Sequence, residues 1–136
     1  MAGAVRTRRE AVQQMLSAAR AAGPQECCGL LGGRDAVISA AFPAPNALAS
    51  TTAFAISPEE LFRIFRAMRD AGLEHLGIYH SHAASENVPS PRDISRAFYP
   101  DAAYFIVSPA AQAKSAVRAF RIRDGLATEL QIEIVE

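Results

Sequence analysis

The sequence predicts an α/β fold of the α+β kind, in which a mixed β-sheet packs against helices. Two observations carry this prediction. Helix-like and strand-like segments follow one another in the order helix, hairpin, helix, strand, helix and strands, which is typical of helices laid on a mixed sheet in one or two layers. Half of the 136 residues are hydrophobic, enough for one core, so we expect a single domain over residues 1–136.

The first part of the chain predicts a helix followed by a hairpin. Apolar residues recur at helical spacing from Arg6 to Ala22, and Gly23-Pro24 ends the pattern. A short apolar strand is expected from Cys27 to Leu31 and a second strand from Ala36 to Ala41. Gly32-Gly33 between them is interpreted as the turn.

The middle of the chain predicts a loop and a well-capped helix. Residues 42–52 are rich in loop-forming residues, and Ala53 to Ile56 is expected to be a short strand. Ser57 is a helix cap, Pro58 takes the first helical position, and Glu60 completes a capping box. We expect this helix to end near residue 72.

The second half predicts a strand, a short helix and a terminal hairpin. The apolar run of residues 76–79 is typical of a buried strand, and Ser90 opens a helix that we expect to end at Pro100. Residues 104–107 form the next predicted strand. Residues 117–122 and 130–135 flank Asp124-Gly125, which predicts a hairpin.

Composition excludes several classes of partner. Lysine plus arginine equals aspartate plus glutamate, 14 of each, so no basic surface is expected for nucleic acid or anionic lipid. No apolar run approaches the ~20 residues of a membrane span, and no signal-peptide pattern begins the sequence. We therefore expect a cytoplasmic protein. The adjacent Cys27 and Cys28 fit a reducing compartment; small buried apolar residues are the favoured interpretation, with a ligand or nucleophile as the alternative.

The most informative segment carries two histidines, a serine and an aspartate. His80 and His82 end an apolar strand, and residues two apart in a strand lie about 7 Å apart on the same face. Two imidazoles on one face can converge on one ion, and Asp93 of the next element can supply a third ligand. Three protein ligands with one open position are typical of catalytic zinc. The pattern therefore indicates zinc-assisted hydrolysis.

Each of these residues also has a purely structural interpretation. Histidines in strands are commonly structural, and Ser90 with Asp93 matches a helix capping box. Hydrolysis also needs a base that moves a proton from water to the leaving amine. Glu26 is the candidate, although a glutamate at the start of a strand is more often a surface residue. Capping and metal binding by Asp93 do not exclude each other.

These residues resemble a known signature. His80-Ser81-His82, seven residues, Ser90, two residues and Asp93 are similar to the motif of the JAMM (MPN-plus) metallopeptidases, without a mismatch. The segment of residues 24–33, with Glu26 shortly before a Cys-Gly pair, resembles the second landmark of that family. The resemblance extends from about residue 24 to the final hairpin and includes Asn46 and Phe54.

The resemblance implies a fold and a role for each matching residue. The implied fold is a cytidine-deaminase-like arrangement of a mixed sheet and helices. By this resemblance His80, His82 and Asp93 are zinc ligands, Glu26 is the general base, and Ser90 steadies the oxyanion or the attacking water. Nothing at these positions departs from the pattern of active members.

The resemblance also implies a class of substrate. The family cleaves amide or isopeptide bonds after the C-terminal Gly-Gly of ubiquitin and its relatives. The short chain is most similar to the compact bacterial hydrolases that release cysteine or a short extension from a ubiquitin-like, β-grasp sulfur-carrier protein. Residues 49–56 are the candidate strand edge for holding such a tail.

Other functions remain open at this point. An isopeptidase that acts on ubiquitin-like conjugates is one alternative, and a non-catalytic module that binds a ubiquitin-like tail is another. A zinc deaminase is disfavoured, since the chain has neither an H-x-E nor a C-x-x-C pattern. The sequence does not identify the carrier, the released residue, the oligomeric state or a metal preference beyond zinc.

Overall fold

Seven strands and three helices make up residues 3–109 and 115–136, the part of the chain that the computed structural model describes. In chain order they are β1 (Ala4–Arg8), α1 (Arg9–Ala22), β2 (Cys28–Arg34), β3 (Val37–Ala44), α2 (Pro58–Asp70), β4 (Glu74–Ser81), α3 (Pro91–Ser95), β5 (Ala103–Val107), β6 (Val117–Arg123) and β7 (Leu126–Val135).

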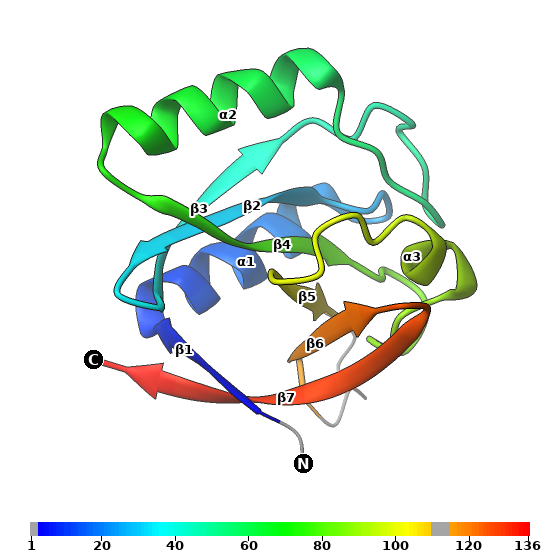
Figure 1. Ribbon diagram of the computed structural model, residues 1–136. Helices are drawn as coiled ribbons and strands as arrows, with labels where there is room; N and C mark the ends of the chain where they lie inside the picture. Colours follow the sequence, from blue (N-terminus) through cyan, green and yellow to red (C-terminus); the bar gives the residue numbers. More distant parts are fainter. Residues whose placement is uncertain (1–2, 110–114) are drawn as a thin grey trace.

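The strands form one mixed sheet that closes on itself. The strand order is β1-β3-β2-β4-β5-β6-β7, and β1 pairs with both β3 and β7. The pairs that include β1 and the pair β4–β5 are parallel, while the remaining neighbours are antiparallel. Figure 1 shows β1 and β7 side by side below the rest of the sheet. The predicted mixed sheet packed with helices is therefore confirmed.

Two hydrophobic cores lie on opposite faces of the sheet. Leu31 packs with Met15 of α1 in the first core, and Leu30 packs with Ile64 of α2 in the second. Figure 1 shows α1 between β4 and the pair β1–β7, and α2 on the other side. Because neighbouring residues of a strand point to opposite faces, His80 shares the α2 face with Ile78.

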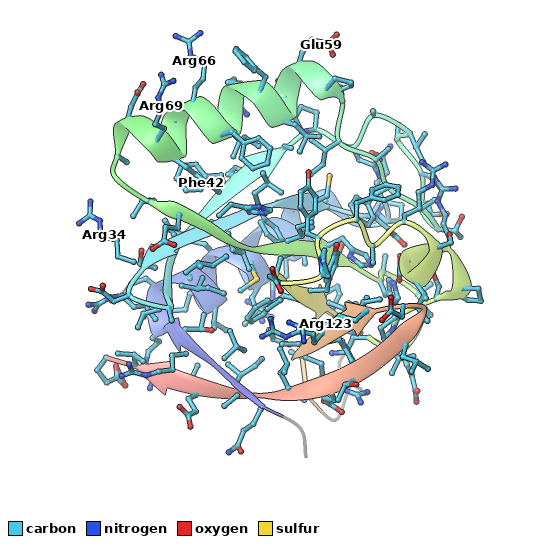
Figure 2. All side chains as sticks on the ribbon, in the orientation of Figure 1. Arg34, Phe42, Glu59, Arg66, Arg69 and Arg123 are labelled. Carbon is cyan, nitrogen blue, oxygen red and sulfur yellow. The ribbon has the colours of Figure 1, made fainter. Side chains whose placement is uncertain are left out.

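Helix α2 begins as predicted. The Ser57 hydroxyl accepts a hydrogen bond from the Glu60 amide at 3.2 Å, and proline follows the cap. The Glu60 carboxylate pairs with Arg63. Of the two hydrogen bonds of the expected capping box, the one accepted by the Ser57 hydroxyl is therefore the one that forms. Arg66 and Arg69 point away from the sheet (Figure 2). No helix among the described residues combines the length and apolar character needed to cross a bilayer.

The start of the first predicted helix was wrong. Residues 4–8 form strand β1, and α1 begins only at Arg9. Val5 and Thr7 of β1 are buried while the residues between them are exposed, which is the alternation of a strand. The longer pairing of β1 is with β7, from the other end of the chain, so no local pattern signals that pairing.

The turn of the first hairpin was also wrong. It lies at Asp35-Ala36, where φ is 53° and 60°. Gly32 and Gly33 stay in β2, at a shift in its register with β3. A Cβ at Gly33 would lie 1.8 Å from the Val37 carbonyl oxygen, so this glycine permits a close approach of two strands.

Two further boundaries differ from the prediction. Residues 53–56 form no strand but belong to a loop, so the expected strand edge over residues 49–56 is absent. Helix α3 ends at Ser95 and not at Pro100. The turn of the terminal hairpin follows the prediction, with Asp124 and Gly125 both at positive φ, but β7 begins at Leu126 and not at residue 130.

Candidate active site

Three of the predicted site residues converge at one end of β4. The Nε2 atoms of His80 and His82 lie 3.1 Å apart. The Asp93 Oδ2 atom lies 3.2 Å from the first nitrogen and 3.1 Å from the second. These three donor atoms therefore form a nearly equilateral triangle. His80 lies near the end of β4, His82 directly follows that strand, and Asp93 lies on α3.

The backbone explains why the two imidazoles meet. His80 is the next-to-last residue of β4 and pairs with Cys28 of β2 on one side and Ile106 of β5 on the other. The His82 amide continues this pairing by donating to the Val107 carbonyl oxygen at 2.9 Å. The alternation of the strand thus persists to His82 and places both rings on one face.

A capping box aims the carboxylate. The Ser90 hydroxyl accepts from the Asp93 amide at 3.0 Å, and Asp93 Oδ2 accepts from the Ser90 amide at 2.9 Å. The structural and the metal-binding interpretations of Asp93 are therefore compatible, because one oxygen serves the cap and faces both imidazoles. Ser90 has used one acceptor position of its hydroxyl, and its O–H remains able to donate.

Contacts around the rings fix their orientation and tautomer. His82 Nδ1 lies 2.8 Å from the Glu86 carbonyl oxygen; a carbonyl only accepts, so Nδ1 carries a hydrogen, and Nε2 is the nitrogen that can bind an ion once it holds no proton. His80 stacks on Phe54, with ring centroids 4.4 Å apart and an interplanar angle of 22°. Both rings therefore present Nε2 to the triangle.

The charge states also suit a cation. Burial lowers the pKa of His80, which keeps that ring neutral. Burial alone would raise the pKa of Asp93, but the hydrogen bonds and charges of the two imidazoles hold it well below its usual range. Burial also opposes protonation of His82, yet its hydrogen bonds with Asp93 and Glu86 raise its pKa overall. A metal ion must therefore displace a proton from His82.

This donor set fits a metal ion. Two imidazole nitrogens and one carboxylate oxygen form the one group of three potential ligands found among the described residues. Imidazole suits zinc, copper, iron and nickel. Three ligands leave coordination positions for water or substrate, as catalytic sites require.

Glu26 stands beside this triangle in a buried position. It lies just before β2, and only 5% of its surface is exposed. Its Oε1 atom is buried and has no hydrogen-bond partner among the described residues. Burial raises the pKa of Glu26 to about 7; the charge on His82 lowers this pKa by a smaller amount, and the charge on Asp93 raises it. A carboxylate with a pKa near neutrality is suited to accept and return a proton.

Asn46 holds the backbone of Glu26 in place. Its Nδ2 donates to the carbonyl oxygens of Glu26 and Ala53, at 3.1 and 2.9 Å. The Glu26 amide donates to the Ser50 carbonyl oxygen at 2.9 Å. The loop that carries Phe54 is therefore tied to the candidate base. The sequence assigned no role to Asn46 or Phe54, and the only signal was that both residues fall within the resemblance to the family.

The two cysteines lie outside the triangle. Cys28 is buried, and burial raises the pKa of its thiol to about 12. Cys27 is half-buried, its thiol pKa is also raised by burial, and it packs against the first core. Both thiols therefore stay protonated near neutral pH, which favours the interpretation of small apolar residues.

A pocket of about 160 Å³ opens next to the triangle. His80 and Asp93 form part of its wall, which places it beside the candidate metal ligands. The rest of the wall is mostly apolar, but it includes Arg92 and Arg96. Sequence reasoning did not single out these arginines, although Arg92 lies inside the motif between Ser90 and Asp93.

Comparison with known proteins identifies curated relatives. The CysO-cysteine peptidase of Mycobacterium tuberculosis is 37% identical over 131 residues, which cover 95% of this chain and 90% of that protein. The desampylase of Haloferax volcanii is 43% identical over 107 residues, which cover 74% of this chain and 77% of that protein. These relatives confirm the expectation of a hydrolase.

Solved structures share the fold. The protein DSY2949 from Desulfitobacterium hafniense superimposes with a TM-score of 0.86 and 33% identity, covering 97% of this chain and 93% of that one. A JAMM structure, described as a metalloprotease-like zinc site in the proteasome and signalosome, gives a TM-score of 0.57 at 21% identity over 98% and 99% of the two chains.

A family profile spans most of the sequence. The profile for prokaryotic homologues of the JAB domain matches residues 8–123. That range includes Glu26, both histidines of the triangle and Asp93. Together with the relatives, this match shows that the chain belongs to the family of prokaryotic JAB-domain homologues.

Proposed function

We propose that this chain is a zinc-dependent peptidase that cleaves the amide bond after the C-terminal Gly-Gly of a ubiquitin-like sulfur-carrier protein. The released group is cysteine or a short C-terminal extension. The observation that carries the proposal is the convergence of three donor atoms within 3.2 Å of one another, with a buried carboxyl of raised pKa beside them.

The triangle supports zinc as the metal. Zinc bonds of about 2.0 Å at tetrahedral angles set ligand atoms roughly 3.3 Å apart, close to the spacing of His80 Nε2, His82 Nε2 and Asp93 Oδ2. A bound zinc ion would polarise the scissile carbonyl and make nearby water more acidic.

Two residues of the chain then carry out the proton transfer and stabilise the oxyanion. Glu26 takes a proton from the attacking water as the new C–O bond forms, and it returns the proton to the departing amine as the C–N bond breaks. Its raised pKa, about 7, suits both steps. The Ser90 O–H, whose oxygen already accepts from the Asp93 amide, donates to the developing oxyanion.

The relatives support the class of substrate. The M. tuberculosis relative is named for a carrier joined to cysteine, and its similarity covers nearly the whole chain. Gly-Gly suits such a reaction because a tail without side chains fits a narrow groove. The expected strand edge at residues 49–56 is a loop, so we assign the tail no β-pairing there.

A second candidate is an isopeptidase that removes ubiquitin-like proteins from conjugates. The similarity to the desampylase favours it. Both candidates use the same metal, base and scissile bond to glycine. They differ in the amine that leaves, which is an α-amino group in one case and a lysine side chain in the other.

The direct test is hydrolysis of extended carriers. Zinc-loaded protein is incubated with ubiquitin-like sulfur carriers that bear one or two residues beyond Gly-Gly, and with an isopeptide-linked carrier conjugate. Mass spectrometry identifies the products. We expect trimming to end at Gly-Gly. Cleavage of unrelated peptides without trimming of any carrier would contradict the substrate class.

Glu26→Gln is the matched control for the chemistry. This variant should keep zinc and lose turnover by roughly 10²–10⁴-fold, the range for a lost general acid–base. Loss of zinc from the variant would mean that Glu26 is a ligand, contrary to the assignment. Catalysis that survives unchanged would remove Glu26 from the mechanism.

A further inference from the structure

The pocket beside the triangle is large enough for one residue. Its volume is about 160 Å³, and an apolar protein cavity of roughly 150 Å³ holds a benzene molecule. Its apolar wall comes from β2, β4, β5, β6, the start of α2 and the loop of residues 54–56. Leu61, Phe98 and Tyr99 also line it.

Two cations stand at this otherwise apolar site. Arg92 and Arg96 lie four positions apart, at the beginning and the end of α3, and both line the pocket. Within the described residues, neither guanidinium makes an ion pair or a side-chain hydrogen bond. Other arginines of the chain are engaged, for example Arg118 with Glu129 at 2.7 Å and Arg123 with Asp101 at 3.1 Å.

The position of these cations relates them to the reaction. The pocket wall includes His80 and Asp93 as well as Arg92, so a group in the pocket is adjacent to the triangle. Arg92 is also near enough to Glu26 for its charge to lower the pKa of that carboxyl. An anion bound here would lie next to the scissile bond, and planar guanidinium groups bind carboxylates by paired hydrogen bonds.

We propose that Arg92 and Arg96 bind the free α-carboxylate of the residue that is released, while its side chain occupies the apolar pocket. The inference rests on the proposed function and decides between its two candidates. A single residue beyond Gly-Gly carries an α-carboxylate next to the scissile bond. In an isopeptide conjugate the scissile nitrogen is the lysine Nζ, which carries a methylene chain and no carboxylate next to the scissile bond. The two arginines therefore select trimming over removal of conjugates.

The test compares two forms of one substrate. A carrier ending in Gly-Gly-Cys is prepared as the free acid and as the C-terminal amide, and kcat/KM is measured with the zinc-loaded protein. We expect the acid to be cleaved faster by roughly 10-fold or more, as for a hydrogen-bonded ion pair. Arg96→Gln and Arg92→Gln should each slow cleavage of the acid more than cleavage of the amide, so that the ratio of the two kcat/KM values falls towards one. Arg96→Lys should restore part of the preference.

Two controls make the result specific. Arg69→Gln removes a charge from α2, where the side chain points away from the sheet (Figure 2), and should keep the preference. Zinc content is measured for every variant, because Arg92 adjoins Asp93. A carrier ending in Gly-Gly-Glu amide tests whether an acidic side chain suffices; cleavage of this amide as fast as the Gly-Gly-Cys acid would overturn the assignment to the α-carboxylate.

A binding measurement separates this inference from the proposed function. Zinc-loaded Glu26→Gln protein is titrated with the acid and the amide by calorimetry, and we expect tighter binding of the acid by a similar factor. Equal affinity, or equal rates for acid and amide in the wild type, overturns the role of the arginines while the proposed function stands. Failure to cleave either form, with cleavage of unrelated peptides, overturns the proposed function as well.

Discussion

Replacement of Glu26 by glutamine should stabilise the metal-free protein at alkaline pH. The pKa of Glu26 in the fold is about 7, against 4.5 for an ordinary glutamate. The folded state therefore holds a proton that the unfolded chain has already lost between pH 4.5 and 7. Stability must fall as the pH rises through this window, because the folded state binds more protons than the unfolded state.

The size of the effect follows from the shift. At about 1.4 kcal/mol for each pKa unit, a rise from 4.5 to about 7 corresponds to about 3 kcal/mol of lost stability above pH 7. Water at the open side of the site screens part of this, so we expect about 2 kcal/mol. Glutamine has nearly the same shape and no charge, so the variant escapes the loss.

The assay is urea denaturation of both proteins in the presence of a chelator, at pH 5 and at pH 8. The free energy of unfolding of Glu26→Gln should exceed that of the wild type by about 2 kcal/mol at pH 8 and by little at pH 5. Glu133→Gln removes a carboxylate from an exposed position of β7 and provides the matched control. A Glu26→Gln variant that is no more stable than the wild type at pH 8 would contradict this linkage between pKa and stability. A gain in stability of the same size at pH 5 and pH 8 would contradict it as well.

Three other predictions concern the metal and the loop. Asp93→Asn should weaken zinc binding by more than roughly 100-fold in a competition titration with a chelator, since lost outer-shell contacts alone cost 10–100-fold; Ser95→Ala on the same helix should leave it unchanged. Zinc affinity should fall as the pH is lowered, approaching roughly tenfold per pH unit, because the ion competes with a proton for His82, whose pKa is raised; a flat profile in the same titration would contradict this. Asn46→Ala leaves the Glu26 carbonyl without its side-chain donor and should cost about 1–3 kcal/mol in thermal or urea unfolding, with lower turnover but full zinc occupancy.

The sequence predicted those parts of the site that depend on short-range geometry. The i, i+2 spacing of two histidines in a strand and the capping box at Ser90 each fix a side-chain direction within a few residues. Their meeting within 3.2 Å required the two elements to pack together, which only the resemblance to the family indicated. The metal ligands, the base, the single domain and the cytoplasmic location stay predictions.

Features that depend on distant parts of the chain were missed. Residues 6–8 of β1 were assigned to a helix because they directly precede the helical pattern. The Gly32-Gly33 pair was interpreted as a turn because glycine commonly makes turns. In the fold Gly33 is needed where β2 and β3 approach closely. The clamp of Asn46 on Glu26 joins residues 20 positions apart, and no periodic pattern signals such a bond.

Closure of the sheet by β1 and β7 has a consequence for the order of folding. The strands around the three donor atoms, β2, β4 and β5, are complete by residue 107. Val5 of β1, in contrast, pairs with Ile132 of β7, which is synthesised last. Contacts so distant along the chain form slowly, because a long loop has to close first. A chain leaving the ribosome can therefore assemble both imidazoles and the carboxylate before its last strand has been synthesised. Capture of the ion and sealing of the core around α1 are then separate events during biosynthesis.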